Sequence, residues 1–109
     1  MRSNISVLQR PQLCLVTDPA VARLEAIVEQ ALAAGITMLQ VRGHQLDAAY
    51  LYALTCRLCP LCHQYGALCI VNDRLDVGMA VKADGFQLGR RSLPLSVARE
   101  VVGKDYLLG

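Results

Sequence analysis

Tryptophan is absent from this sequence, and phenylalanine occurs once beside four tyrosines. So few aromatic rings leave no platform on which nucleobases could stack. The 11 Lys and Arg residues against 9 Asp and Glu residues give a formal net charge of +2, with no basic stripe. A nucleic-acid-binding domain normally shows such a stripe. We therefore expect no nucleic-acid partner.

Long apolar runs are also missing. No segment approaches the roughly 18 apolar residues that are needed to cross a bilayer. The start of the chain, Met1 to Arg10, is short and polar, without the apolar core of a signal peptide. We interpret residues 1–11 as a leader, and we predict a cytoplasmic protein without a membrane partner.

Five cysteines in a cytoplasmic protein argue against a disulfide framework. Three of them, Cys56, Cys59 and Cys62, form the pattern Cys-x-x-Cys-x-x-Cys, and His63 comes next. This pattern is superficially similar to a zinc or cluster site. The same spacing places the thiols along one side of a helix, where free cysteine behaves as a small buried hydrophobe. We favour the buried helix face, and a cysteine-based metal or redox module is the alternative.

The sequence does contain a regular alternation of apolar runs and helical patterns. Its composition, 54% hydrophobic and 18% charged, is typical of strands covered by helices. The stretch from Leu68 to Pro94 shows one full unit, with a buried-strand pattern, a polar exit, a short helix and a second strand. We expect strands at 13–17, 36–41, 67–71, 86–88 and 106–108, each separated from the next by a helix.

Three residues mark expected features of the helices. Asp18 and Asp73 each follow a predicted strand and are suited to cap the helix that comes next. Pro60 falls inside the predicted second helix and removes one backbone donor, so we expect a kink or a break there.

The alternation predicts one α/β domain with parallel strands, over residues 12–109. Two architectures agree with it. One is a small open sheet with helices on both sides, and the other is the first half of a (βα)8 barrel, which typically needs about 200 residues or more. Periodicity alone does not choose between them.

Polar residues follow the predicted strands where each strand ends. Parallel strands present these ends at one edge, where ligands of α/β proteins bind. Simpler interpretations also exist: a buried Gln can satisfy backbone groups, an Arg pair can be solvated, a lone His can be a loop residue, and Asp73 can be a helix cap. The candidates at this edge are Gln40, Arg42, His44, Asn72, Asp73, Arg90 and Arg91.

Four segments carry a resemblance to a known family: LCLVTD, AGITMLQVR, VNDRLDVGMAVKADGFQLGRRSLP and VVGKDYLLG. Together they resemble the amino-terminal part of the thiamine-phosphate synthases and of their relatives, the TenI-type thiazole tautomerases. The resemblance covers nearly the whole chain from Leu13 onward. It implies a (βα)8 barrel, of which residues 12–109 would be an incomplete part with strands one to five.

The resemblance also implies roles for the residues at the strand ends. Three residues match those that bind a pyrimidine and its diphosphate in the family: Gln40, Arg42 and His44. His44 stands in place of a Lys. Asn72 matches a diphosphate ligand, and Asp73 matches a magnesium ligand. The position of the family's second magnesium ligand holds Ser92 here, next to Arg90 and Arg91. A single carboxylate beside two guanidinium groups is a poor magnesium site. We therefore expect Arg90 and Arg91 to bind a phosphate directly.

These departures favour a tautomerase-like protein of thiamine biosynthesis that acts on a thiazole phosphate, with His44 as the candidate catalytic group. Two alternatives are a thiamine-phosphate synthase and a non-catalytic, truncated remnant of such a barrel. We expect no cofactor unless synthase activity, with Mg²⁺, is retained. The expected partners are a phosphorylated thiazole or pyrimidine and, through exposed strand edges, a second copy of the chain.

Overall fold

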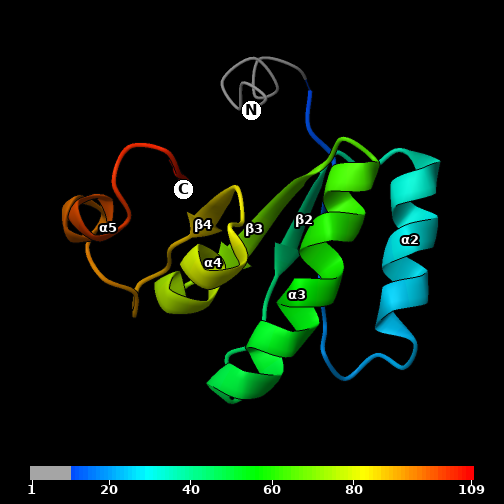
Figure 1. Cartoon of the computed structure of the whole chain (residues 1–109), viewed down its shortest axis with the longest axis horizontal. Coiled ribbons are helices and arrows are strands. Elements are labelled where there is room, and N and C mark those ends of the chain that lie inside the picture. Colours follow the sequence, from blue (N-terminus) through cyan, green and yellow to red (C-terminus); the bar gives the residue numbers. More distant parts are fainter. Residues whose placement is uncertain (1–10) are drawn as a thin grey trace.

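The computed structural model describes residues 11–109, so the predicted leader lies almost wholly outside the described residues. Strands and helices alternate throughout this part (Figure 1). The elements are β1 (Cys14–Val16), α2 (Leu24–Ala34), β2 (Met38–Val41), α3 (Ala48–Gln64), β3 (Leu68–Asn72), α4 (Leu75–Val81), β4 (Gly85–Gln87), α5 (Leu95–Val102) and β5 (Leu107–Leu108). Every predicted strand is present, with small shifts at its ends.

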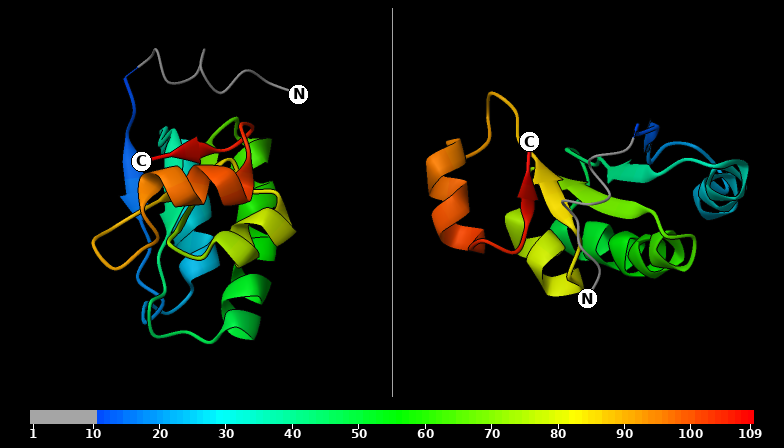
Figure 2. Two further views of the ribbon diagram at one scale, coloured as in Figure 1. Left: turned by 90° about the vertical axis from the view of Figure 1, so that its left-hand side faces the viewer. Right: turned by 90° about the horizontal axis from the view of Figure 1, so that it is seen from above.

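The strands form one sheet in which β1, β2, β3, β4 and β5 lie side by side in chain order. Every pairing is parallel. Right-handed crossovers that always step in the same direction place successive helices on the same face of a sheet. Figure 2 shows α3 and α4 along one face of a curved sheet, with α2 and α5 towards its two ends. This winding is that of a (βα)8 barrel, because doubly wound open sheets reverse their strand order.

The core lies between the sheet and the helices. Leu39 and Val41 of β2 are fully buried, and the strand register places them beside Cys69 and Val71 of β3. Phe86 of β4 continues this row next to Val71. The buried residues form two clusters, one below α2 and α3 and one among α4, β4 and α5. On each strand, the residues in between have their side chains on the opposite face of the sheet. The polar residues at the strand ends lie at the edge of that face.

Helix α4 packs closely on β4 because it carries a glycine at the contact. Gly78 is buried, and a Cβ at this position would overlap the ring of Phe86. That ring is 1% exposed and lies 5.5 Å, centroid to centroid, from the tilted ring of Tyr106. The missing side chain of Gly78 therefore leaves the space that the ring fills, and this contact fixes α4 against β4.

Two of the predicted helix caps are wrong. Helix α2 begins after Arg23, which has a left-handed backbone conformation, and Asp18 instead accepts a hydrogen bond from the N–H of Ala20 at 3.0 Å. Helix α4 begins after Arg74 without a side-chain cap, and Asp73 lies one residue earlier with φ 65°. Both aspartates therefore belong to turns at the strand exits, before the helices start.

Pro60 does not break α3, which continues through it from Ala48 to Gln64. Proline lacks the N–H that would bond to the carbonyl four residues earlier, which belongs to Cys56. Both Pro60 and Cys56 are exposed. Water can therefore satisfy that carbonyl, and the helix passes the proline without interruption.

The prediction that three cysteines share one helix face is also wrong. Cys56 is exposed, whereas Cys59 and Cys62 are buried. A step of three residues falls about 60° short of a full helical turn, so the side chains drift around the helix. Within residues 11–109, no three His, Cys, Asp or Glu side chains group in a way that could hold a metal ion.

Candidate functional site

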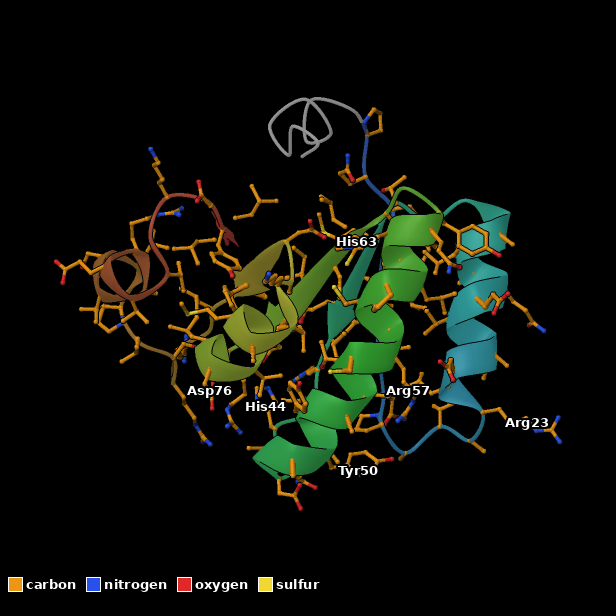
Figure 3. All side chains as sticks on the ribbon, in the orientation of Figure 1. Arg23, His44, Tyr50, Arg57, His63 and Asp76 are labelled. Atoms are coloured by element: carbon orange, nitrogen blue, oxygen red, sulfur yellow. The ribbon has the colours of Figure 1, made fainter. Side chains whose placement is uncertain are left out.

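A cleft of about 470 Å³ lies between the loops that follow β1 and β2. The exposed side chains of Arg42 and His44, both predicted from the sequence, line it. Thr17, Asp18 and Gln45 line it as well, and the sequence analysis did not select them. Figure 3 shows His44 at the lower end of the molecule, where β2 has ended. The cleft therefore opens at the carboxyl edge of the sheet.

Thr17 fastens the end of β1 to the end of β2. Its side-chain oxygen accepts a hydrogen bond from the backbone N–H of Arg42 at 3.0 Å, and its own N–H donates to the carbonyl of Gln40 at 3.0 Å. Thr17 is only 5% exposed. The backbone on either side of Val41 is thus held in place, so the Arg42 side chain starts from a fixed point.

Gln40 and Asn72 meet directly across the neighbouring strands β2 and β3. The Nδ2 atom of Asn72 donates a hydrogen bond to Oε1 of Gln40 at 2.9 Å, and both residues are half-buried. The bond leaves the amide nitrogen of Gln40 as a donor and Oδ1 of Asn72 as an acceptor for a ligand. The register places Asn72 beside Gln87 of β4, which continues the row of amides.

The exit of β3 carries two carboxylates in different situations. Asp76 is held by Arg74, whose Nε and Nη2 donate to its two oxygens at 3.1 and 2.7 Å. These hydrogen bonds lower the pKa of Asp76 and raise that of Arg74. Asp73 instead has a left-handed backbone with φ 65°, a conformation that costs about 1–2 kcal/mol for a residue with a Cβ. Its N–H is fixed to the carbonyl of Gln87 at 2.9 Å.

The loop after β4 is closed by a serine. The hydroxyl oxygen of Ser92 accepts a hydrogen bond from the N–H of Gly89 at 2.9 Å. Arg90 and Arg91, which lie between these two residues, are both exposed. The turn therefore presents two guanidinium groups at the same edge of the sheet as Arg42, and guanidinium groups bind phosphate oxygens well.

The side chains at this edge do not fit a magnesium ion held by two carboxylates. Asp73 offers one carboxylate, but Asp76 is occupied by Arg74. The resemblance assigns the position of the second ligand to Ser92, whose hydroxyl oxygen accepts a hydrogen bond within its own turn. Magnesium prefers carboxylate and other oxygen ligands, and guanidinium groups repel it. The balance of charge at this edge favours an anion.

We use the word mouth for the carboxyl edge formed by the exits of β2, β3 and β4. The structure brings all the predicted residues to this edge, and Gln40 and Asn72 are in direct contact. Thr17 was missed because a threonine at the end of an apolar run is an ordinary strand residue. Its position at the exit of β1 was the available signal. The mouth comprises Gln40, Arg42, His44, Asn72, Asp73, Arg90 and Arg91.

Replacing Thr17 with valine is expected to lower the free energy of unfolding by about 1–3 kcal/mol, because the change leaves the N–H of Arg42 without its acceptor at nearly constant volume. Urea titration followed by circular dichroism would measure the loss. Thr17→Ser keeps the hydroxyl and is the control. Equal stability of the valine and serine variants would show that this hydrogen bond does not stabilise the loop.

The chain-order parallel sheet, with its polar mouth at the carboxyl edge, defines part of a (βα)8-barrel protein. The family model described as thiamine monophosphate synthase matches residues 13–109. This chain belongs to that family, which confirms the resemblance seen in the sequence.

Individual relatives agree with this assignment. A thiamine-phosphate synthase from Nostoc sp. is 44% identical over 103 residues, which are 94% of this chain and 29% of the relative. Another from Chlorobium phaeovibrioides is 41% identical over 92% of this chain and 47% of its own length. The solved thiamine phosphate pyrophosphorylase from Pyrococcus furiosus superposes with a TM-score of 0.84 and 35% identity, covering 90% of this chain and 48% of that chain. The chain thus spans less than half the length of these relatives.

Proposed function

We propose that the mouth binds the phosphate groups of a phosphorylated pyrimidine or thiazole in thiamine biosynthesis. The observation that carries this proposal is the direct contact of Gln40 with Asn72, next to the backbone-anchored Arg42. An amide donor, an amide acceptor and a guanidinium group from adjacent strands suit a polar ring with a charged tail. Arg90 and Arg91 supply further positive charge for a second phosphate oxygen.

For the chemistry, the first candidate is the condensation of a pyrimidine diphosphate with a thiazole phosphate to give thiamine phosphate. The names of the relatives from Nostoc and Chlorobium support this reaction. In this proposal Gln40 and Asn72 orient the pyrimidine side, and Arg42 neutralises the diphosphate. His44, exposed in the cleft, is placed to transfer a proton.

A second candidate is the tautomerase-like reaction, in which a proton moves on a thiazole carboxylate phosphate. Ser92 is the specific observation in its favour, because the hydroxyl closes its own turn where a second carboxylate would be needed for metal-assisted ionisation. This reaction requires a general acid or base rather than a metal, and His44 is the candidate within the described residues.

A chimeric barrel distinguishes the two candidates. In it, this chain replaces the matched part of the Pyrococcus furiosus protein. We expect the chimera to convert pyrimidine diphosphate and thiazole phosphate to thiamine phosphate, measured by chromatography, and we expect Ser92→Asp to raise the rate in Mg²⁺ by restoring a carboxylate. Formation of an isomerised thiazole without thiamine phosphate would support the second candidate. If neither product forms but the chimera still binds diphosphate, both proposed reactions would be contradicted and only the binding function would remain.

Several finer predictions belong to the same proposal. None of the helices in residues 11–109 combines the length and the apolar character needed to cross a bilayer. A cytoplasmic location, the absence of a nucleic-acid partner and self-association through strand edges stay predictions. Self-association is supported by exposed apolar side chains on α5, such as Leu95, which is 60% exposed.

A further inference from the structure

The cleft beside the exits of β1 and β2 contains one carboxylate to which the proposed function gives no role. Asp18 lines this cleft together with Arg42 and His44. Within residues 11–109, the carboxylate of Asp18 forms no salt bridge with either of these side chains. A carboxylate and a guanidinium group thus border the same space without being paired with each other.

A turn fixes the position of this carboxylate. Oδ1 of Asp18 accepts a hydrogen bond from the backbone N–H of Ala20 at 3.0 Å, and the backbone carbonyl of Asp18 accepts one from the N–H of Val21 at 3.1 Å. The preceding residue, Thr17, is held to the end of β2 by the two hydrogen bonds described above. Oδ2 of Asp18 has no hydrogen-bond partner within the part of the chain that the structure describes. This oxygen is therefore a fixed acceptor that is open to a ligand.

The charges of the cleft discriminate between the ligands of the proposed function. Arg42 offers donors for phosphate oxygens. A carboxylate accepts a hydrogen bond from the amine of an aminopyrimidine, as carboxylates do from the exocyclic amine of cytosine in protein–DNA complexes. A thiazole carboxylate phosphate offers no such amine, and its carboxylate would be repelled by that of Asp18. An aminopyrimidine diphosphate therefore complements both side chains, whereas a thiazole carboxylate phosphate complements Arg42 alone.

We propose that Asp18 is a specificity-determining residue, whose Oδ2 accepts a hydrogen bond from the exocyclic amine of an aminopyrimidine while Arg42 binds the diphosphate of the same molecule. This inference rests on the proposed function, and it names the class of ligand that the cleft takes. The volume of the cleft, about 470 Å³, is within the range of about 300–1,000 Å³ that is typical of small-molecule sites. The binding site thus extends from the mouth to the exit of β1.

Calorimetric titration of the 109-residue chain with two ligands tests the proposal without any substitution. One ligand is a 4-aminopyrimidine that carries a diphosphate on a methylene group at C5, and the other has a hydrogen in place of the amine. We expect the amine to strengthen binding about tenfold. This is the lower end of the effect of a hydrogen bond to a charged group, because Asp18 is exposed.

Asp18→Asn is the matched variant for this comparison. Its amide oxygen can still accept the N–H of Ala20, so the turn is kept, but Nδ2 replaces the open oxygen and presents a donor to the amine. We expect the preference for the amine to disappear. The affinity for inorganic diphosphate is expected to stay the same or to rise about twofold, because a negative charge near the phosphate has been removed.

Asp105→Asn is the control for the loss of charge. Asp105 is an exposed carboxylate in the segment before β5, and it does not line the cleft. We expect this variant to keep both the preference for the amine and the affinity for inorganic diphosphate.

The outcomes separate this inference from the proposed function. Equal affinities of the unaltered chain for the two pyrimidines, with inorganic diphosphate still bound, would overturn the role of Asp18 alone. A preference for the amine that persists in Asp18→Asn would do the same, as would tighter binding of a thiazole carboxylate phosphate than of the aminopyrimidine. If the unaltered chain does not bind inorganic diphosphate, the proposed function is wrong and this inference is wrong with it. The two-ligand comparison decides even if Asp18→Asn does not fold.

Discussion

Replacing Arg42 with alanine is expected to weaken the binding of inorganic diphosphate about 10- to 100-fold. Hydrogen bonds to charged groups contribute about 1.5–3 kcal/mol, and about 1.4 kcal/mol corresponds to a tenfold change in affinity. The substitution keeps the backbone N–H that Thr17 binds, so the loop itself should be preserved. Isothermal titration of the chain with diphosphate would measure the change.

The matched control for this measurement is Arg57→Ala. Arg57 lies on α3 and faces Glu25 of α2 at 4.0 Å, so the variant removes the same charge away from the mouth. Its affinity for diphosphate should stay close to that of the unaltered chain. If both variants bind diphosphate equally well, Arg42 does not contact the phosphate and the proposed function loses its main cation.

Replacing Phe86 with alanine is expected to lower the free energy of unfolding by about 3–5 kcal/mol. The ring is 1% exposed, fills the space that Gly78 leaves, and contacts Tyr106. Its removal therefore leaves a cavity that links α4, β4 and the segment before β5. Chemical denaturation followed by circular dichroism would show the midpoint moving to a lower concentration of denaturant.

Leu95→Ala provides the comparison for Phe86→Ala. Leu95 is also a large apolar residue near the end of the chain, but it is 60% exposed, so its truncation should change stability by no more than about 0.5 kcal/mol. Similar losses for the two variants would contradict the packing described for Phe86.

The strands are the part of this fold that the sequence predicts well, because each apolar run ends in a glycine or a polar residue. The starts of the helices are harder to predict. Asp18 is a good capping residue, yet α2 begins only after Arg23, because the chain makes extra turns before it enters the helix. The choice between a barrel and an open sheet also lies beyond periodicity, since it depends on the order in which strands pair.

The candidate site is predictable in its location but not in its contacts. Parallel strands bring Arg42 and Asn72 to one edge, and the sequence suffices for that inference. The hydrogen bond from Asn72 to Gln40 depends on the register between β2 and β3, which cannot be derived from the sequence. The role of Thr17 depends on a partner 25 residues away in the chain, so no local pattern signals it.

The chain-order arrangement of the strands has a consequence for synthesis on the ribosome. Within residues 11–109, each strand after β1 docks on the strand made just before it. The growing polypeptide can therefore add one strand and one helix at a time, which shortens the interval in which its apolar segments are exposed to other nascent chains.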